Sequence, residues 1–300
     1  MTGRALEVVV PGPLALVQDL GRPGLQGWGV APSGAFDRGA HDRAQRLMGN
    51  DPAAAGLEVL FGPFAAVARG DLVVVVTGGE CEVTVGGRAE AGEMALYLRD
   101  GERLELGRCV AGARLSVGVR GGVDVPAVLG SRSRDVGGGI GPAPLAAGNL
   151  LPVGAQVRGE PHYGPARLAR PGPLVVDLAP GPHDDALGEH AWDAVEGTAW
   201  VVGERSDRMG VRLEAGPSGT SVRGAGELAS FPVVPGSIQL TPSGELVVLG
   251  PDAGVTGGYP VLGVVFRQGL DALAQARPGT AVGVRRRMRR GPGRSRGLVG

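Results

Sequence analysis

Apolar residues occur along this chain in short runs that glycine and proline close at nearly regular intervals. Residues 6–10 end at a Pro-Gly pair, residues 14–19 end before Gly21, and residues 72–77 form a continuous aliphatic run that closes on a threonine. Such runs predict β-strands, and an unbroken aliphatic run predicts a strand buried on both faces. Short strands at regular spacing are typical of a β-barrel or a β-sandwich. Further strands are expected at 80–85, 94–98, 103–106, 114–119, 174–178, 198–202, 237–240, 245–249 and 261–266.

One segment follows a helical period instead. In residues 36–48, apolar positions recur at the i, i+4 and i+8 spacing that places them on one face of an α-helix, which we expect to pack against the barrel. Ser33 is expected to cap the start of this helix, and Gly49 to adopt the left-handed conformation after its end. His41 falls on the side that we expect to be exposed. Two weaker helices are expected at 184–195 and 270–276.

The strand pattern is lost between residues 134 and 173, which hold three consecutive glycines and few strand-forming residues. A stretch of this kind predicts a linker or a long functional loop. We therefore expect a first β-rich unit at 1–133, a linker or loop at 134–173, and a second β-rich unit at 174–284. Residues 285–300 are dense in arginine, glycine and proline and predict a disordered basic tail.

Composition narrows the range of functions. The chain has 56 glycines and 24 prolines in 300 residues, but 43% of its residues are hydrophobic, which favours a folded chain with many turns over a disordered one. All 30 basic residues are arginine. A chain without lysine cannot carry biotin or a lipoyl group, cannot form a Schiff base, and cannot contain the lysine of a Walker A phosphate loop.

Charge, cysteine content and hydropathy exclude further classes. The formal net charge is +0, which argues against general nucleic-acid binding. Cys81 and Cys109 have no metal-ligand spacing and are expected to be free thiols in strands. We expect no metal site, although a turn containing His183 is an alternative place for one. With neither a signal region nor an apolar run of roughly 18 residues, the chain is expected to be soluble, cytoplasmic and not in a membrane.

Three polar clusters are candidates for chemistry. The first, at 18–24, places a carboxylate and a guanidinium beside glycines, which allows either close approach of a ligand or a structural Asp–Arg pair. In the second, at 206–214, Arg208 and Arg212 share a strand face at period two, which suits a carboxylate or phosphate but also describes a solvated face. The third joins Asp252 to a glycine-rich loop at 256–260, typical of a binding loop or of an ordinary hairpin.

The motifs at these clusters also carry a resemblance. Their order and spacing resemble the biotin-dependent carboxyltransferase-like group, which includes the C subunit of 5-oxoprolinase, the KipA regulators and the second half of the carboxyltransferase domain of urea amidolyase. The resemblance runs from about residue 6 to about residue 284. It rests on Val10-Pro11-Gly12, Val17-Gln18-Asp19-Leu20-Gly21-Arg22-Pro23-Gly24, Ser33-Gly34-Ala35-Phe36-Asp37, Gly56-Leu57-Glu58, Gly130-Ser131-Arg132-Ser133, Ser206-Asp207-Arg208-Met209-Gly210, Ser237-Ile238-Gln239 and Thr256-Gly257-Gly258-Tyr259-Pro260.

The resemblance implies a mainly β fold made of tandem cyclophilin-like β-barrels with a few short helices. It implies the C subunit of an ATP-dependent 5-oxoprolinase, which converts 5-oxoproline, ATP and water to glutamate. Its partners would be a KipI-like protein and a larger protein of the lactam-utilisation type, and ATP would be bound in the complex rather than by a P-loop here. Two alternatives stay open: a carboxyltransferase acting on urea or a similar amide, with biotin on another chain, and a KipA-like regulator that antagonises a kinase inhibitor.

Clusters and motifs together give the candidate site residues. Arginines would clamp a carboxylate or phosphate, and Asp19 would orient a guanidinium or polarise water. The catalytic candidates are Asp19, Arg22 and Arg208; the substrate-binding candidates are Gln18, Arg132, Ser133, Arg212, Gln239, Thr256, Gly258 and Tyr259. The sequence also departs from the family pattern in a shortened loop at 140–151 and in the loop at 252–256, where a glutamine and a threonine are missing.

Overall fold

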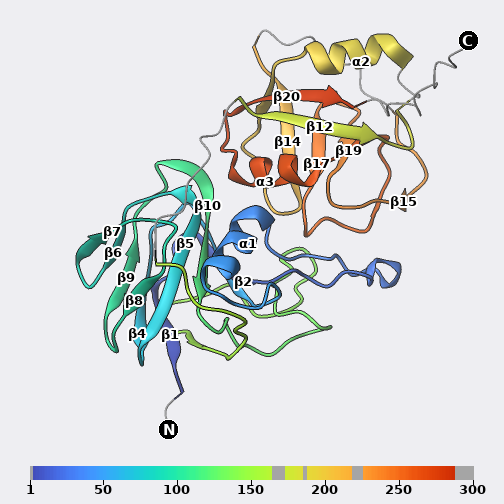
Figure 1. Ribbon diagram of the computed structural model, residues 1–300. Helices are drawn as coiled ribbons and strands as arrows, with labels where there is room; N and C mark the ends of the chain where they lie inside the picture. Colours follow the sequence, from blue (N-terminus) through green and yellow to red (C-terminus); the bar gives the residue numbers. More distant parts are fainter. Residues whose placement is uncertain (1–2, 164–172, 185–187, 218–225, 288–300) are drawn as a thin grey trace, which may run out of the picture.

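The computed structural model describes residues 3–163, 173–184, 188–217 and 226–287. These residues form two β-rich units, the N-terminal one at the lower left of Figure 1 and the C-terminal one at the upper right. Strands dominate both units and the helices are short, which confirms the predicted mainly β fold with a few short helices. Among the described residues, no helix has the length and apolar character that crossing a bilayer requires.

The first unit consists of two β-sheets whose buried side chains share one apolar core. A six-stranded sheet has the order β11-β1-β4-β9-β6-β7, and a five-stranded sheet has the order β2-β3-β10-β5-β8. Leu6, Phe64 and Leu104 enter the core from the first sheet, and Leu57 and Leu115 from the second. The strands are β1 (Ala5–Val10), β2 (Leu14–Gln18), β3 (Gly56–Leu60), β4 (Phe64–Arg69), β5 (Leu72–Glu80), β6 (Val83–Val85), β7 (Arg88–Glu90), β8 (Leu96–Leu98), β9 (Arg103–Leu106), β10 (Ala111–Val119) and β11 (Leu150–Pro152).

The segment expected as a linker or loop, 134–173, is described as far as residue 163. Within it, β11 pairs antiparallel with β1 and extends the six-stranded sheet. The backbone N–H of Arg134 donates to Val17 O, and that of Leu145 donates to Ala15 O, so the loop follows the edge of β2. Residues 134–163 are therefore part of the first unit and not a spacer between two bodies.

Helix α1 (Arg38–Leu47) lies where the two units meet (Figure 1). Its N-cap is Asp37, whose side chain accepts from Ala40 N, and not Ser33 as the sequence suggested. Gly49 has φ 61, as expected for the residue after the helix end. The expectation that His41 is exposed is wrong: it is 1% exposed and lines a small cavity with Gln18, Leu57 and Glu58.

The second unit is a closed barrel with the strand order β12-β19-β16-β17-β14-β13-β20. Trp192, Trp200, Ile238 and Leu262 are buried in its core. The strands are β12 (Val175–Pro180), β13 (Trp200–Val202), β14 (Gly210–Ala215), β16 (Ser237–Leu240), β17 (Leu246–Leu249), β19 (Val261–Val265) and β20 (Ala281–Arg286), with a small separate pair, β15 (Phe231–Pro232) and β18 (Thr256–Gly257). Helices α2 (Gly188–Gly197) and α3 (Arg267–Gln275) lie near the expected positions, and the first unit carries a short 3-10 helix η1 (Gln26–Trp28).

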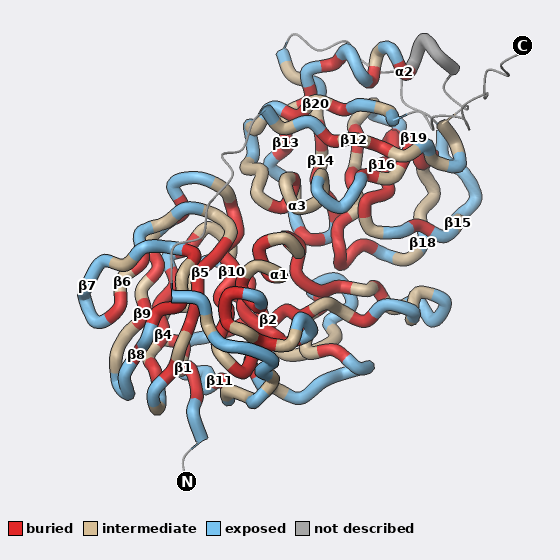
Figure 2. The backbone as a smooth tube through the Cα atoms, in the orientation of Figure 1, coloured by how far each residue is buried: buried red, intermediate tan, exposed pale blue. Residues whose placement is uncertain are grey.

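Side chains of the first unit reach into the second. Phe36, which precedes α1, is 4% exposed and belongs to the apolar core of the barrel. From the other side, α3 packs against α1 and β10. Figure 2 shows the buried backbone continuing from the sheets of the first unit through this junction into the barrel. The junction is therefore buried like a protein interior, and the polar side chains inside it need hydrogen-bond or ion-pair partners.

Two expectations about the ends of strands need correction. Cys81 and Cys109 are free thiols, but neither lies in a strand: Cys81 follows β5 and Cys109 follows β9. The predicted disordered tail begins too early, because Arg285 and Arg286 belong to β20, and Arg285 and Arg287 both pair with Asp177. The barrel closure between β12 and β20 orders these arginines. Residues 288–300 lie outside the described residues.

Candidate functional site

Asp19 lies at the end of β2, and its carboxylate is fully engaged by the protein. Oδ1 accepts from Gly21 N at 2.7 Å and from the hydroxyls of Ser131 and Ser133 at 2.6 Å each. Oδ2 accepts from Arg132 N at 2.6 Å. The side chain is 6% exposed. This carboxylate links the end of β2 to residues 131–133 by hydrogen bonds, so it stabilises the fold at this point.

Two other predicted residues, Arg22 and Gln18, lie beside Asp19, and each has one polar atom without a hydrogen-bond partner among the described residues. Arg22 is 2% exposed; its Nη2 donates to Ser133 O at 2.5 Å, while Nη1 has no partner within the described residues. Burial lowers the pKa of Arg22, although Asp19 and other nearby carboxylates oppose the shift. Gln18 donates from Nε2 to Arg134 O at 2.9 Å. Its Oε1 is buried and accepts no hydrogen bond from any described residue.

Arg132 and Ser133 are also committed to the fold. Arg132 donates from Nε to Val125 O at 2.8 Å and from Nη2 to Asp124 Oδ1 at 2.5 Å. Ser133 is 0% exposed, and its hydroxyl accepts from Asp19 N at 2.8 Å. The structure therefore brings Gln18, Asp19, Arg22, Arg132 and Ser133 together, but most of their polar atoms are bonded to one another and to the backbone.

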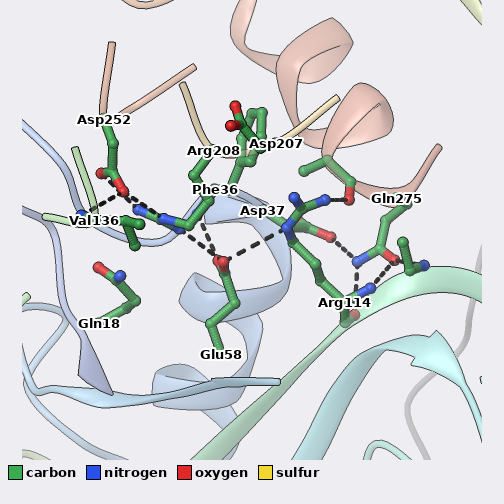
Figure 3. A network of polar contacts seen from close by, with 12 residues as sticks. Gln18, Phe36, Asp37, Glu58, Arg114, Val136, Asp207, Arg208, Asp252 and Gln275 are labelled. Carbon is green, nitrogen blue, oxygen red and sulfur yellow. Dashed lines mark hydrogen bonds and ion pairs between the residues drawn. The ribbon is translucent and has the colours of Figure 1, made fainter. Parts of the chain in front are cut away.

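Arg208 crosses the junction between the units (Figure 3). Its Nε and Nη2 form a bidentate pair with Asp252 at 2.7 and 2.9 Å, and Nη1 donates to Glu58 Oε1 at 2.7 Å. Nη2 also donates to Gly34 O at 2.7 Å. Asp252 in turn accepts from Val136 N at 3.1 Å, so the loop at 134–139 is bound to the same carboxylate. We call Glu58, Arg114, Arg208 and Asp252 the junction cluster.

Charges in the junction cluster stabilise one another. Burial acts against the charge of Arg208, but Glu58 and Asp252 outweigh it and the pKa of Arg208 is raised. Burial acts against ionisation of Glu58 as well, yet Arg208 and Arg114 outweigh it and the pKa of Glu58 is lowered. Burial lowers the pKa of Arg114, which lies 3.5 Å from Glu58 and 4.6 Å from the centre of the Phe36 ring.

The prediction that Arg208 and Arg212 share a strand face is wrong. Arg208 precedes β14 and is 4% exposed inside the junction, whereas Arg212 lies within β14 on the outer face of the barrel. A turn closed by Asp207, which accepts from Met209 N and Gly210 N, separates the two environments. A period-two count across that turn fails because β14 begins only at Gly210.

On the outer face of the barrel, β14, β16 and β17 line an open groove of about 610 Å³. We call it the barrel groove. Three of the predicted substrate-binding residues, Arg212, Gln239 and Tyr259, lie along it. The loop that includes Ala253 and Gly254 closes one side, so the groove adjoins the loop that begins at Asp252. Its volume is within the range of small-molecule sites.

Polar groups in the barrel groove retain bonding capacity. Arg212 Nη1 is 3.8 Å from Glu245 Oε2, at the far limit of an ion pair, and Arg205 holds the other oxygen of that carboxylate at 2.9 Å. Gln239 donates to Tyr259 O at 3.3 Å, which leaves its amide oxygen for another donor. The Tyr259 hydroxyl makes no hydrogen bond to the described residues. A guanidinium, an amide and a phenol thus face one open space.

Thr256 and Gly258 are displaced from the barrel groove. Thr256 is exposed and belongs to β18, which pairs with β15. Gly258 O accepts from Leu228 N at 2.7 Å. The glycine between them was not a predicted site residue, although a Cβ at Gly257 would lie 2.4 Å from Gln239 Nε2. Glycine at 257 lets the amide of Gln239 keep its position.

The predicted site missed Glu58, Arg114 and Gln275. Gln275 of α3 accepts from Ala113 N and Arg114 N at 2.9 and 3.0 Å and donates to Asp37 Oδ2 at 2.6 Å. One signal was available for Glu58, which is the only charged residue in the apolar strand Gly56–Leu60. A charged group there has to be paired if it is buried. No local signal distinguishes Gln275 from other helix residues.

Comparison with known proteins adds independent information. The family model for the carboxyltransferase domain, subdomain A and B, matches residues 28–286 of this chain. Among curated proteins, the C subunit of 5-oxoprolinase from Escherichia coli (strain K12) is 33% identical over 274 residues, which cover 90% of this chain and 87% of that protein. The match includes both units and the junction cluster between them.

Two solved structures extend the similarity to the fold. The crystal structure of TTHA0988 superposes with a TM-score of 0.85 at 32% identity, over 95% of this chain and 56% of that one. The crystal structure of the K. lactis urea amidolyase superposes with a TM-score of 0.85 at 27% identity, over 93% of this chain and 18% of that one. The chain therefore spans about half of the first protein and under a fifth of the second.

Proposed function

Because this chain belongs to the family of the carboxyltransferase domain, subdomain A and B, we propose that it is the C subunit of an ATP-dependent 5-oxoprolinase. The complex would open 5-oxoproline to glutamate with ATP and water, and its other members would be a KipI-like protein and a protein of the lactam-utilisation type. The observation that carries the proposal is the similarity to the C subunit of E. coli 5-oxoprolinase along 90% of this chain and 87% of that protein.

The barrel groove is the place where this chain would bind the substrate. 5-Oxoproline carries a carboxylate and a ring amide, and Arg212 offers a guanidinium for the carboxylate. The amide of Gln239 would pair with the lactam amide, and the Tyr259 hydroxyl would donate to the lactam oxygen. Both contacts would hold the ring in one orientation while its carbonyl is attacked.

The nucleotide is not assigned to this chain. Its sequence has no lysine, so the phosphate loop that uses one is absent, and the buried arginines of the junction are already paired with carboxylates. ATP supplies the phosphoryl group that would activate the lactam carbonyl. We therefore propose that the nucleotide site lies on another member of the complex.

The test is reconstitution. The chain is co-expressed with its KipI-like and lactam-utilisation-type partners, and ATP-dependent release of glutamate from 5-oxoproline is measured. We expect activity only with all three chains present, and a rise in KM for 5-oxoproline in Arg212→Gln. Arg69→Gln, an exposed arginine paired with Glu7 on the first unit, is the matched control. A stable three-chain complex that releases no glutamate would contradict the proposal.

A second candidate, carboxyl transfer to urea or a similar amide, is favoured by the superposition on the K. lactis urea amidolyase over 93% of this chain. In that case the carboxyl group would arrive on biotin attached to a different chain. The same preparation distinguishes the two functions when it is assayed with urea, bicarbonate and a biotinylated carrier. Carboxylation without glutamate release would select this candidate.

A further inference from the structure

A second cavity lies between the two units and shares only Asp207 with the lining of the barrel groove. It has a volume of about 160 Å³, and its walls include Leu14, Leu16 and Leu60 from the first unit and Val211, Leu273 and Ala276 from the second. We call it the inter-unit cleft. A volume of about 150 Å³ is enough for a molecule of the size of benzene. The cleft therefore has room for one small apolar body.

The charges around the inter-unit cleft are unequal. Three carboxylates line it, those of Glu58, Glu204 and Asp207, against the two guanidinium groups of Arg114 and Arg208. Glu58 is bound to Arg208 at 2.7 Å, and Arg208 has Asp252 as its second counter-ion, so the floor is neutralised. Glu204 and Asp207 are exposed and form no ion pair with any other described residue. The rim is therefore negative above apolar walls.

Phe61 completes the wall of the inter-unit cleft in a strained conformation. Its φ is 58, in the left-handed region that a bulky side chain seldom adopts. The backbone is held there by Phe61 N donating to Ala113 O at 2.7 Å and by Phe61 O accepting from Cys109 N at 2.9 Å. Strain of this kind is concentrated at ligand clamps and active sites. The fold thus fixes an aromatic side chain against the cleft.

From these observations we propose that the inter-unit cleft binds a small organic cation, a primary ammonium on an apolar body. The apolar body packs against Leu14, Leu60 and Val211, and the ammonium lies at the rim between Glu204 and Asp207. An anion of the same shape is repelled by these two exposed carboxylates. This site goes beyond the proposed function and does not depend on it, since its ligand is recognised by the cleft alone.

Calorimetric titration of the full chain with n-pentylamine, pentanoate and 1-pentanol tests the proposal. We expect saturable binding of the amine with a Kd on the order of 1 mM, weaker binding of the alcohol and none of the carboxylate. Glu204→Gln should weaken amine binding by about threefold, and the double variant Glu204→Gln/Asp207→Asn by about tenfold. Leu60→Trp, which fills the cleft, should abolish it.

Glu82→Gln is the matched control, because Glu82 is an exposed carboxylate on the first unit away from the cleft. It should leave the Kd for the amine unchanged. The proposal is overturned if the wild-type chain shows no saturable amine binding, if pentanoate binds as well as the amine, or if the double variant binds the amine as tightly as the wild type. Glu204 is exposed and makes no hydrogen bond or ion pair with the described residues, so the Glu204→Gln arm stands even if Leu60→Trp or the double variant does not fold.

Discussion

Arg208 of the second unit donates to Glu58 of the first at 2.7 Å, and neither side chain is more than 8% exposed. The pair joins β3 to the turn before β14, across the junction. With Asp252 on its other edge, the guanidinium holds two carboxylates from distant parts of the chain. Arg208 therefore binds the two units together, which is a different role from the substrate clamp suggested by its motif.

Removing the Arg208 side chain should destabilise the whole chain. Arg208→Met leaves Asp252 buried without its counter-ion and leaves Glu58 with Arg114 alone at 3.5 Å, and we expect a loss of about 3–5 kcal/mol in the free energy of unfolding. Arg208→Lys should also lose stability, because one ammonium cannot reach both carboxylates and Gly34 O. Urea denaturation measures both. The control is Arg205→Met, whose pair with Glu245 is exposed and should cost less than about 1 kcal/mol.

The pH dependence of stability follows from Glu58. Its pKa in the folded chain is lowered, so it favours folding fully above the pKa of an unfolded glutamate, about 4.3. This stabilisation is lost as the pH falls through the lower folded pKa. The difference in unfolding free energy between the wild type and Glu58→Gln should therefore be large at pH 7 and shrink towards pH 3. A difference that stays constant with pH would contradict the role of the ion pair.

Gln275 should be needed for the docking of α3 on the first unit. In Gln275→Ala, the buried N–H groups of Ala113 and Arg114 and the carboxylate of Asp37 each lose a partner, and we expect a loss of about 3 kcal/mol. Burial raises the pKa of Asp37, and the hydrogen bond from Gln275 opposes that shift by stabilising the ionised form, so loss of this donor should cost most when the carboxylate is ionised. Gln268→Ala, an exposed glutamine of the same helix, is the control for helix propensity. Chemical denaturation at pH 7 compares the two.

Asp19 should behave as a structural residue. Asp19→Asn replaces Oδ2 by an amide donor that faces Arg132 N, and we expect a loss of about 2–3 kcal/mol in stability. Ser131→Ala, which removes one of the donors to Oδ1, should cost about 1 kcal/mol. Thermal unfolding measures both. If Asp19→Asn is as stable as the wild type but inactive in the reconstituted complex, a catalytic role for Asp19 is favoured instead.

Substitutions in the barrel groove should affect ligand binding and leave stability unchanged. Tyr259→Phe removes a hydroxyl that has no partner within the described residues, so the unfolding free energy should change by less than about 0.5 kcal/mol. The KM for 5-oxoproline in the reconstituted complex should rise several-fold if the hydroxyl binds the lactam. Tyr97→Phe is the control for loss of a tyrosine hydroxyl. That hydroxyl is bonded to Asp71 at 2.5 Å on the first unit, away from the barrel groove, so the KM should stay unchanged.

The sequence was sufficient for most of the strands and for α1, because both depend on local periodicity and turn residues. It was not sufficient for pairings between distant segments. The period of α1 identified its apolar face, yet His41 on the other face is buried, and it shares a small cavity with Gln18 and Glu58. Likewise, β11 extends the first sheet through a pairing with β1 that no local pattern contains.

For the candidate site as well, the sequence identified individual residues but not the pairings between distant ones. Motifs located Gln239 and Tyr259, and the polar cluster at 206–214 supplied Arg212; the structure places all three along one groove. The role of Arg208 could not be read from its motif, because its partner Glu58 lies 150 residues earlier in the chain. Pairing of buried charges is decided by the three-dimensional fold, and a sequence pattern shows only that a partner is needed.

Phe36 has a consequence for how the protein is made. Its ring completes the core of a barrel whose first strand begins at Val175. On the ribosome, the first unit emerges with this ring and the guanidinium of Arg114 uncovered until the second unit has been synthesised. We therefore expect a truncated chain that stops before the barrel to expose the Phe36 ring and to aggregate more readily than the full chain.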